Sequence, residues 1–101
     1  MPKLAADTWF LYIARCADGT LYTGIARDVQ ARIAAHDAGK GARYTRGRGP
    51  LTLCAVRRFR SKGRALALEH AIKQLPRIAK EQLLVEGGLS RMRLRAPKGR
   101  A

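Results

Sequence analysis

The sequence predicts a single α+β domain built from a β-hairpin, a further strand and helices. Three observations lead to this prediction. Two β-rich segments flank an Asp18-Gly19 turn signal, and apolar residues recur with helical spacing after Ser61. A chain of 101 residues with 47% hydrophobic content is long enough for one compact domain with a modest core.

The hairpin is predicted over residues 9–26. A two-residue loop would place Tyr12 and Tyr22 on opposite faces, whereas the three-residue loop 17–19, with Gly19 at positive φ, shifts the register by one. The longer loop is preferred because it segregates the side chains, with Leu11, Ile13, Leu21 and Ile25 on one face and Phe10, Tyr12, Tyr22 and Gly24 on the other. Taken alone, the two tyrosines indicate an ordinary cross-strand aromatic contact.

The next predicted element is a helix from the N-cap Asp28 to about Ala38, with Gly39 at its end. Arg32 and His36 lie four residues apart, so they project from the same side of this helix. Taken singly, Arg32 is typical of a solvated helix cation and His36 of a cation near a helix C-terminus.

An irregular, glycine-rich loop is predicted over residues 39–50. Cations interleaved with an aromatic ring suit a nucleic-acid backbone with a base stacked on the ring, and a solvated loop is the nearly equal alternative. The candidate nucleic-acid-binding residues of this loop are Lys40, Arg43, Tyr44, Arg46 and Arg48.

The net charge of +14 favours a polyanionic partner, because each cation near a phosphate releases a condensed counterion. Between Asp37 and Glu69 the chain has nine cations and no acidic residue, which indicates a phosphate-facing surface. A basic protein of the ribosomal type would have the same charge balance.

A third, mostly buried strand is predicted over residues 51–59, followed by a helix from Ser61 to about Leu75. Glu69 lies within the apolar stripe of this helix, where a carboxylate needs a cation, a hydrogen bond or a metal. An ion pair with Lys73, four residues later, is the simpler interpretation for an isolated helix, and a metal ligand is the functional one.

Pro76 is predicted to begin a short third helix, with Ile78, Leu84 and Val85 on one side and glycines 87–88 at its end. The segment 89–101 has five cations and no acid, which predicts a basic tail that adds DNA affinity.

The domain is therefore expected to span residues 1–88 and the tail residues 89–101. Cys16 and Cys54 lack the spacing of a zinc site and are expected to be reduced and buried. No segment has the character of a signal peptide or the length of a membrane span, so a cytosolic protein without a membrane partner is expected.

Two short motifs of the chain resemble those of a known family. Phe10-Leu11-Tyr12 and Tyr22-Thr23-Gly24 resemble the paired tyrosine motifs of the GIY-YIG nuclease superfamily. The resemblance extends over residues 8–84 and adds a helical arginine, a histidine one turn later and a helical glutamate. In this chain the five corresponding residues are Tyr12, Tyr22, Arg32, His36 and Glu69.

The resemblance is to the small stand-alone branch of the superfamily. It implies a three-stranded antiparallel sheet flanked by helices and a DNA nuclease that uses one divalent cation, Mg²⁺ or Mn²⁺, on Glu69. The cation would act as a Lewis acid, and Arg32 would meet phosphate oxygens with two parallel donors. Nearby cations would favour the phenolate of Tyr12 or let it relay a proton, so Tyr12 is assigned as base or water-orienting group, with Tyr22 and His36 as partners.

Two alternatives accompany the prediction of a nuclease. Many members carry a later active-site asparagine, and this sequence contains none, which favours a catalytically weak or inactive module that binds nucleic acid. A third possibility is a basic protein that uses the scaffold to bind a protein partner. The retained Glu69 favours the nuclease, because a pure binding module does not need a carboxylate on an apolar stripe.

Overall fold

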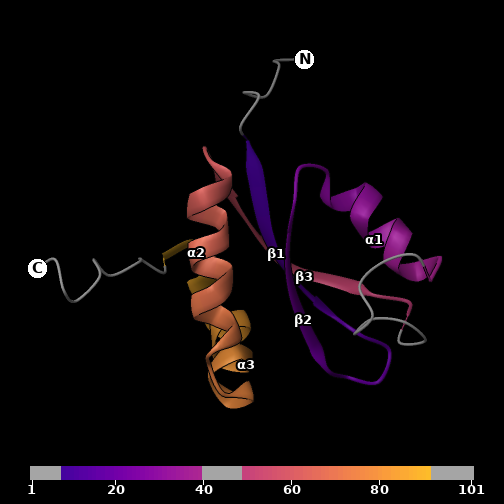
Figure 1. Cartoon of the computed structure of the whole chain (residues 1–101). Helices are drawn as coiled ribbons and strands as arrows, with labels where there is room; N and C mark the ends of the chain where they lie inside the picture. The colour runs from indigo at the N-terminus through magenta and orange to yellow at the C-terminus, as the bar shows by residue number, and fades with distance from the viewer. Residues whose placement is uncertain (1–7, 40–48, 92–101) are drawn as a thin grey trace, which may run out of the picture.

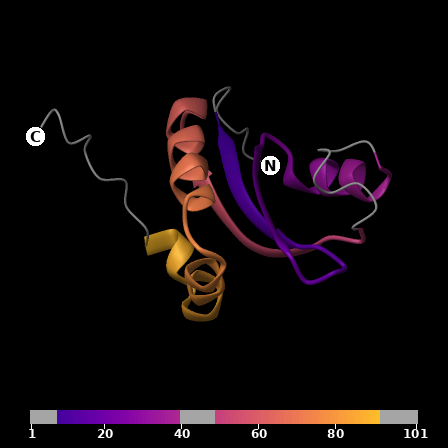
Figure 2. The ribbon, with the colours of Figure 1, turned by 60° about the horizontal axis from the view of Figure 1, so that its bottom comes forward.

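Three antiparallel strands form the sheet, in the order β2-β1-β3. The structure is a computed structural model that describes residues 8–39 and 49–91. Strand β1 is Trp9–Arg15, β2 is Leu21–Ala26 and β3 is Thr52–Phe59. Helices α2 and α3 lie on one side of the sheet and α1 on the other (Figures 1 and 2). The predicted fold class is confirmed.

The hairpin has the predicted three-residue loop. Tyr12 pairs with Gly24, the Cys16 N–H donates to the Thr20 carbonyl at 2.8 Å, and Gly19 has a φ of +89°. Tyr22 stands opposite Ala14, two positions from the partner of Tyr12, so the two tyrosines are diagonal neighbours on one face.

Helix α2 (Lys62–Lys73) closes the larger core on the opposite face of the sheet. The Ser61 hydroxyl caps it by accepting a hydrogen bond from the Arg64 N–H at 3.3 Å, as predicted for this residue type. The aliphatic face of the hairpin and the apolar stripe of α2 meet in one cluster, whose most buried members include Leu11, Ile13, Ala65, Leu68 and Ile72.

Helix α1 (Val29–Asp37) covers the tyrosine face. The Asp28 carboxylate caps it by accepting from the Ala31 N–H at 3.0 Å. At its other end the Asp37 carboxylate accepts from the Leu51 N–H at 2.8 Å and ties the helix to the chain entering β3. These bonds fix both ends of the helix that carries Arg32 and His36.

Strand β3 was predicted to be mostly buried, and that prediction is wrong. In β3 only Phe59 is buried, while Leu53, Cys54 and Val56 are exposed. Because the hairpin pairs β1 with β2 and β3 adds to the other side of β1, β3 is an edge strand. Cys54 is therefore exposed, and Cys16 alone matches the prediction of buried thiols.

Two expectations for the C-terminal part also need correction. In α3 (Arg77–Glu86), Ile78 and Val85 are exposed, and only Leu84 of the predicted trio packs against the core. The segment assigned to the tail starts with a short 3₁₀ helix, η2 (Gly88–Arg91), whose Leu89 is buried in the main core. The folded domain therefore continues past residue 88, and residues 92–101 lie outside the described part of the chain.

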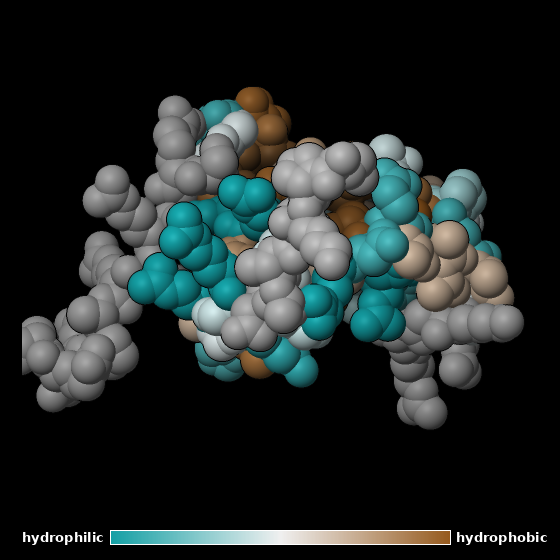
Figure 3. All heavy atoms as spheres, turned by 90° about the horizontal axis from the view of Figure 1, so that it is seen from above, coloured by the Kyte–Doolittle hydropathy of each residue, from teal (hydrophilic) through white to brown (hydrophobic). Residues whose placement is uncertain are grey.

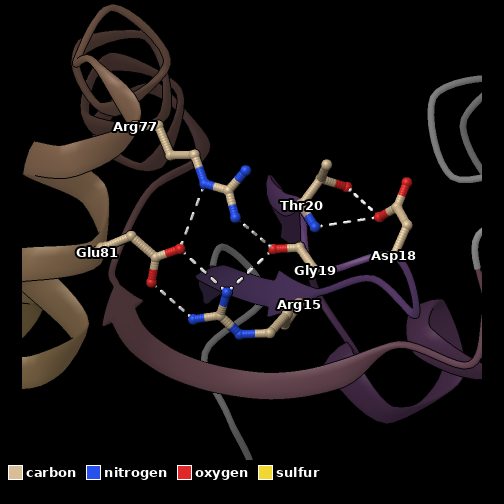
Figure 4. Close-up of polar contacts among 6 residues, drawn as sticks. All are labelled: Arg15, Asp18, Gly19, Thr20, Arg77 and Glu81. Carbon is tan, nitrogen blue, oxygen red and sulfur yellow. Dashed lines mark hydrogen bonds and ion pairs between the residues drawn. The ribbon is translucent and has the colours of Figure 1, made fainter.

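A polar network fastens α3 to the hairpin turn (Figure 4). Arg15 forms a bidentate ion pair with Glu81, with hydrogen bonds of 2.7 and 3.0 Å. It also donates to the Gly19 carbonyl at 3.0 Å. Arg77 donates to the same carbonyl at 3.0 Å and lies 3.5 Å from Glu81. The start of α3 is therefore held beside the start of β2. None of the described helices is long and apolar enough to cross a membrane.

The Glu81 network predicts a specific acid sensitivity. Hydrogen bonds from Arg15 are the main reason that the pKa of Glu81 is lowered from its ordinary 4.5, and Arg77 adds to the effect. The network's stabilisation is complete above the unfolded pKa and is lost as the pH falls through the folded value. Denaturant unfolding at a series of acidic pH values should therefore show a smaller loss of stability in Glu81→Gln than in wild type. Parallel curves for wild type and Glu81→Gln would contradict the prediction.

Candidate active site

The centre of the candidate site is a contact between three rings. The Tyr12 hydroxyl lies 3.0 Å from His36 Nε2. The Tyr22 ring lies edge-on to His36 with centroids 5.0 Å apart, and the two tyrosine rings are 6.1 Å apart. Residues from β1, β2 and α1 thus meet, although 24 positions separate Tyr12 from His36.

Gly24 makes this contact possible. A Cβ atom at this position would lie 2.8 Å from the Tyr12 hydroxyl oxygen and 3.0 Å from Tyr22 Cε2. Tyr12 is 1% exposed and has no room to move away. The glycine of the second motif therefore has a packing role: it lets the two tyrosines close over the strand.

Burial controls the protonation of Tyr12 and His36. Desolvation raises the pKa of Tyr12 well above its ordinary value of 10, with smaller upward effects from Tyr22 and Glu69 and an opposing effect from Arg32. Desolvation lowers the pKa of His36, and the Arg32 charge lowers it further. Among the protein's own groups, burial outweighs the charge of Arg32, so the pKa of Tyr12 is raised and its phenol form is favoured. Both groups are neutral at pH 7, and the His36 tautomer sets the direction of their hydrogen bond.

Arg32 and Glu69 flank the rings. Arg32 is exposed on α1, and both residues act on Tyr12 through their charges. Glu69 lies on α2 with its side chain 16% exposed, and its carboxylate is 3.3 Å from Lys73 Nζ. The ion pair considered from the sequence is therefore formed, and the carboxylate still lies within electrostatic range of Tyr12.

The donor set around Glu69 is sparse. Within residues 8–39 and 49–91 no group of three or more His, Cys, Asp or Glu residues could enclose a metal ion. A single carboxylate nevertheless fits Mg²⁺, which commonly binds through one or two carboxylates together with water and substrate phosphate. Glu69 could therefore contribute one ligand to a metal that is completed by substrate.

The nucleic-acid-binding candidates Lys40, Arg43, Tyr44, Arg46 and Arg48 lie outside the described residues. Exposed cations do gather elsewhere. Hydrophilic residues cover much of the end of the molecule at which α2 begins (Figure 3). At this end Arg27 and Lys62 approach the Trp9 ring, at 6.0 and 5.1 Å from its centroid.

The cleft beside Tyr22 is a part of the site that was not expected from the sequence. An open cleft beside Tyr22 is lined by Lys73 and Lys80, and Lys80 was not a candidate. Lys80 comes from α3, so its position depends on the docking of α3 against the hairpin. No local spacing in the sequence gives that docking.

Replacing Gly24 should damage the ring contact. We expect Gly24→Ala to lower the free energy of unfolding by about 1–3 kcal/mol, as overpacking of buried sites does, and to separate Tyr12 from His36. Gly63→Ala is the matched control, because a Cβ at that helical position meets nothing within 4 Å. That control should be neutral or stabilising by up to about 1 kcal/mol. Denaturant unfolding measures both, and an unchanged Gly24→Ala stability would show that the tyrosines can part at no cost.

The histidine should titrate below its ordinary pKa of 6.5. Because the Arg32 charge opposes imidazolium, Arg32→Gln should raise the His36 pKa, while Arg27→Gln, beside Trp9, should leave it unchanged. A pH titration of the imidazole signals by NMR tests this. A His36 pKa at or above 6.5 in wild type would contradict the buried neutral imidazole.

Comparison with known proteins agrees with this geometry. The GIY-YIG catalytic domain matches residues 8–82. The chain is similar to UPF0213 proteins of Natronomonas pharaonis (51% identity, covering 82% of this chain and 96% of the relative) and Halobacterium salinarum (53%, covering 72% and 95%). It is also similar to two solution NMR structures. One is a UPF0213 protein from Bacillus halodurans (48% identity, TM-score 0.54, covering 81% of this chain and 87% of that one), and the other is a protein from E. faecalis (30%, TM-score 0.57, covering 88% and 95%). The chain belongs to the GIY-YIG family.

Proposed function

We propose that this protein is a metal-dependent nuclease that hydrolyses phosphodiester bonds in DNA. The observation that carries the proposal is the three-ring contact of Tyr12, Tyr22 and His36, with the charges of Arg32 and Glu69 acting on it. A surface that only bound DNA would not need a buried tyrosine and a neutral histidine in hydrogen-bond contact.

Phosphodiester hydrolysis requires a deprotonated water and compensation of the charge that develops on phosphorus. The exposed guanidinium of Arg32 can hold phosphate oxygens through paired hydrogen bonds. Glu69 is the proposed ligand of a divalent cation, Mg²⁺ or Mn²⁺, which would supply Lewis-acid stabilisation of the phosphate when bound.

The exposure of the tyrosines suggests how their roles divide. Tyr22 is only half-buried and lines the open cleft, so its hydroxyl is the one we propose to orient the attacking water. Tyr12 was the residue assigned to this role from the sequence, but at 1% exposure it suits an inner position. A proton from water can pass by way of Tyr22 and Tyr12 to His36, whose lowered pKa leaves the imidazole able to accept it.

The alternative is a binding module without catalysis. The absence of asparagine from the chain and the ion pair that already neutralises Glu69 favour it. The two functions differ in what they require of Glu69, because only hydrolysis needs its negative charge.

Glu69→Gln separates the two functions. We expect it to abolish cleavage supported by Mg²⁺ or Mn²⁺ and to leave DNA binding largely intact, because glutamine keeps the shape but loses the charge that holds a hard cation. Glu86→Gln, an exposed carboxylate on α3, should cleave like wild type. The measurements are cleavage rates on linear, nicked, branched and single-stranded DNA with each metal and with chelator, together with DNA affinity.

Two results would count against the proposal. Equal cleavage by wild type and Glu69→Gln would remove Glu69 from the site. Absence of cleavage by wild type with every metal and every DNA would leave the binding module as the function.

A further inference from the structure

A cleft runs along the free edge of β2, next to the three rings. It has a volume of about 250 Å³ and is lined by Leu21, Tyr22, Thr23, Lys73 and Lys80. This volume is far larger than the roughly 30 Å³ of one water, so the cleft has room for a phosphodiester group. Tyr22 belongs both to the cleft and to the ring contact, so the two sites adjoin.

Two lysines from different helices line this cleft. Lys73 comes from the last residue of α2 and Lys80 from α3. Lys73 forms an ion pair with Glu69, with its Nζ 3.3 Å from the carboxylate. Within the described part of the chain Lys80 forms no ion pair, and its neighbour Glu81 is engaged by Arg15 and Arg77. Of the residues that line the cleft, the two charged ones are therefore both lysines, and Lys80 is the one without an ion pair among the described residues.

The backbone of β2 adds a donor. The bond from the Cys16 N–H to the Thr20 carbonyl marks a hydrogen-bonded pair of the hairpin, and such pairs alternate along an antiparallel ladder. The pairs Ala14–Tyr22 and Tyr12–Gly24 are therefore hydrogen-bonded, and the N–H of Thr23 points away from β1. Since β2 is an edge strand, this N–H points outward from the free edge of the sheet, and Thr23 is one of the residues that line the cleft.

The helix that carries Lys80 is held in place before any ligand arrives. The contacts of Glu81 with Arg15, and of Arg77 with the Gly19 carbonyl, dock the first turns of α3 on the hairpin (Figure 4). Lys80 lies one residue before Glu81, so the same contacts set the position of its backbone. A lysine carried on a docked helix binds an anion with less loss of conformational entropy than one on an unanchored segment.

We propose that this β2-edge cleft binds a backbone phosphate of the nucleic acid, next to the phosphate that is cleaved, through Lys73, Lys80 and the Thr23 N–H. The inference rests on the proposed function, since it places one strand across both Tyr22 and the cleft. Ammonium groups and a backbone N–H are donors without acceptors, and this combination suits phosphate oxygens. Arg32 would hold the reacting phosphate, and the cleft would fix the direction of the strand.

The test measures binding without cleavage. The ¹⁵N-labelled protein is titrated in EDTA with inorganic phosphate and with an eight-nucleotide single-stranded DNA, and the backbone amide signals of residues 21–23, 73 and 80 are followed. DNA affinity is also measured against salt concentration for wild type, Lys80→Gln and Lys80→Arg. Lys80→Arg is the matched control, because it keeps the positive charge at the same position of α3.

The proposal expects DNA to shift the Thr23 amide and expects Lys80→Gln to reduce that shift. It also expects Lys80→Gln to weaken DNA binding several-fold and to reduce the log–log salt slope by about 0.7, the value of one contact on a single strand. Lys80→Arg should keep the wild-type slope. Equal slopes for Lys80→Gln and Lys80→Arg would overturn the proposal, as would shifts with inorganic phosphate but none with DNA. If these binding results hold while wild type cleaves nothing, the subsite stands and only the proposed hydrolysis fails.

Discussion

The close approach of two tyrosines over one glycine is the constraint on which the rest of the site depends. A Cβ at Gly24 would collide with both rings, so the hairpin must present a bare backbone at that position. The register places Gly24 opposite Tyr12, and the three-residue loop sets the register. A shift of one residue would move the tyrosines to different faces and separate Tyr12 from the histidine on α1. The turn at residues 17–19 thus determines the contact between Tyr12 and His36 on the face of the sheet that α1 covers.

Segregation of side chains explains why the hairpin could be predicted from sequence. Its aliphatic residues can share a face in only one of the two registers, so the pattern selects the loop length. Capping residues were equally informative, because Asp28 and Ser61 each bond a nearby backbone N–H in the structure. The order Tyr12, Tyr22, Arg32, His36 and Glu69 indicated the family, which the comparison confirms. The chemical roles of these residues stay predictions.

The predictions that were wrong share a cause. The local pattern of apolar residues does not show which helices and strands cover one another. The apolar residues of β3 indicated burial, but the strand lies at an edge and leaves Val56 exposed. Ile78 and Val85 likewise share a side of α3 that faces solvent. Leu89, assigned to a tail, fills the main core because the chain turns back after α3. The ion pair between Arg15 and Glu81 spans 66 positions, and only the docked helix brings its partners together.

The edge position of β3 bears on whether two copies of this protein can pair strand to strand. A strand at the border of a sheet offers backbone groups that can pair with another molecule, and long flat borders promote aggregation. Here the strand carries Arg57 and Arg58, and a register irregularity interrupts its pairing beside Ile13 and Ala14. Repulsion between like charges and a kinked border both disfavour pairing of β3 with a second copy. The arginines of β3 thus act against strand pairing at the same edge where its apolar residues are exposed.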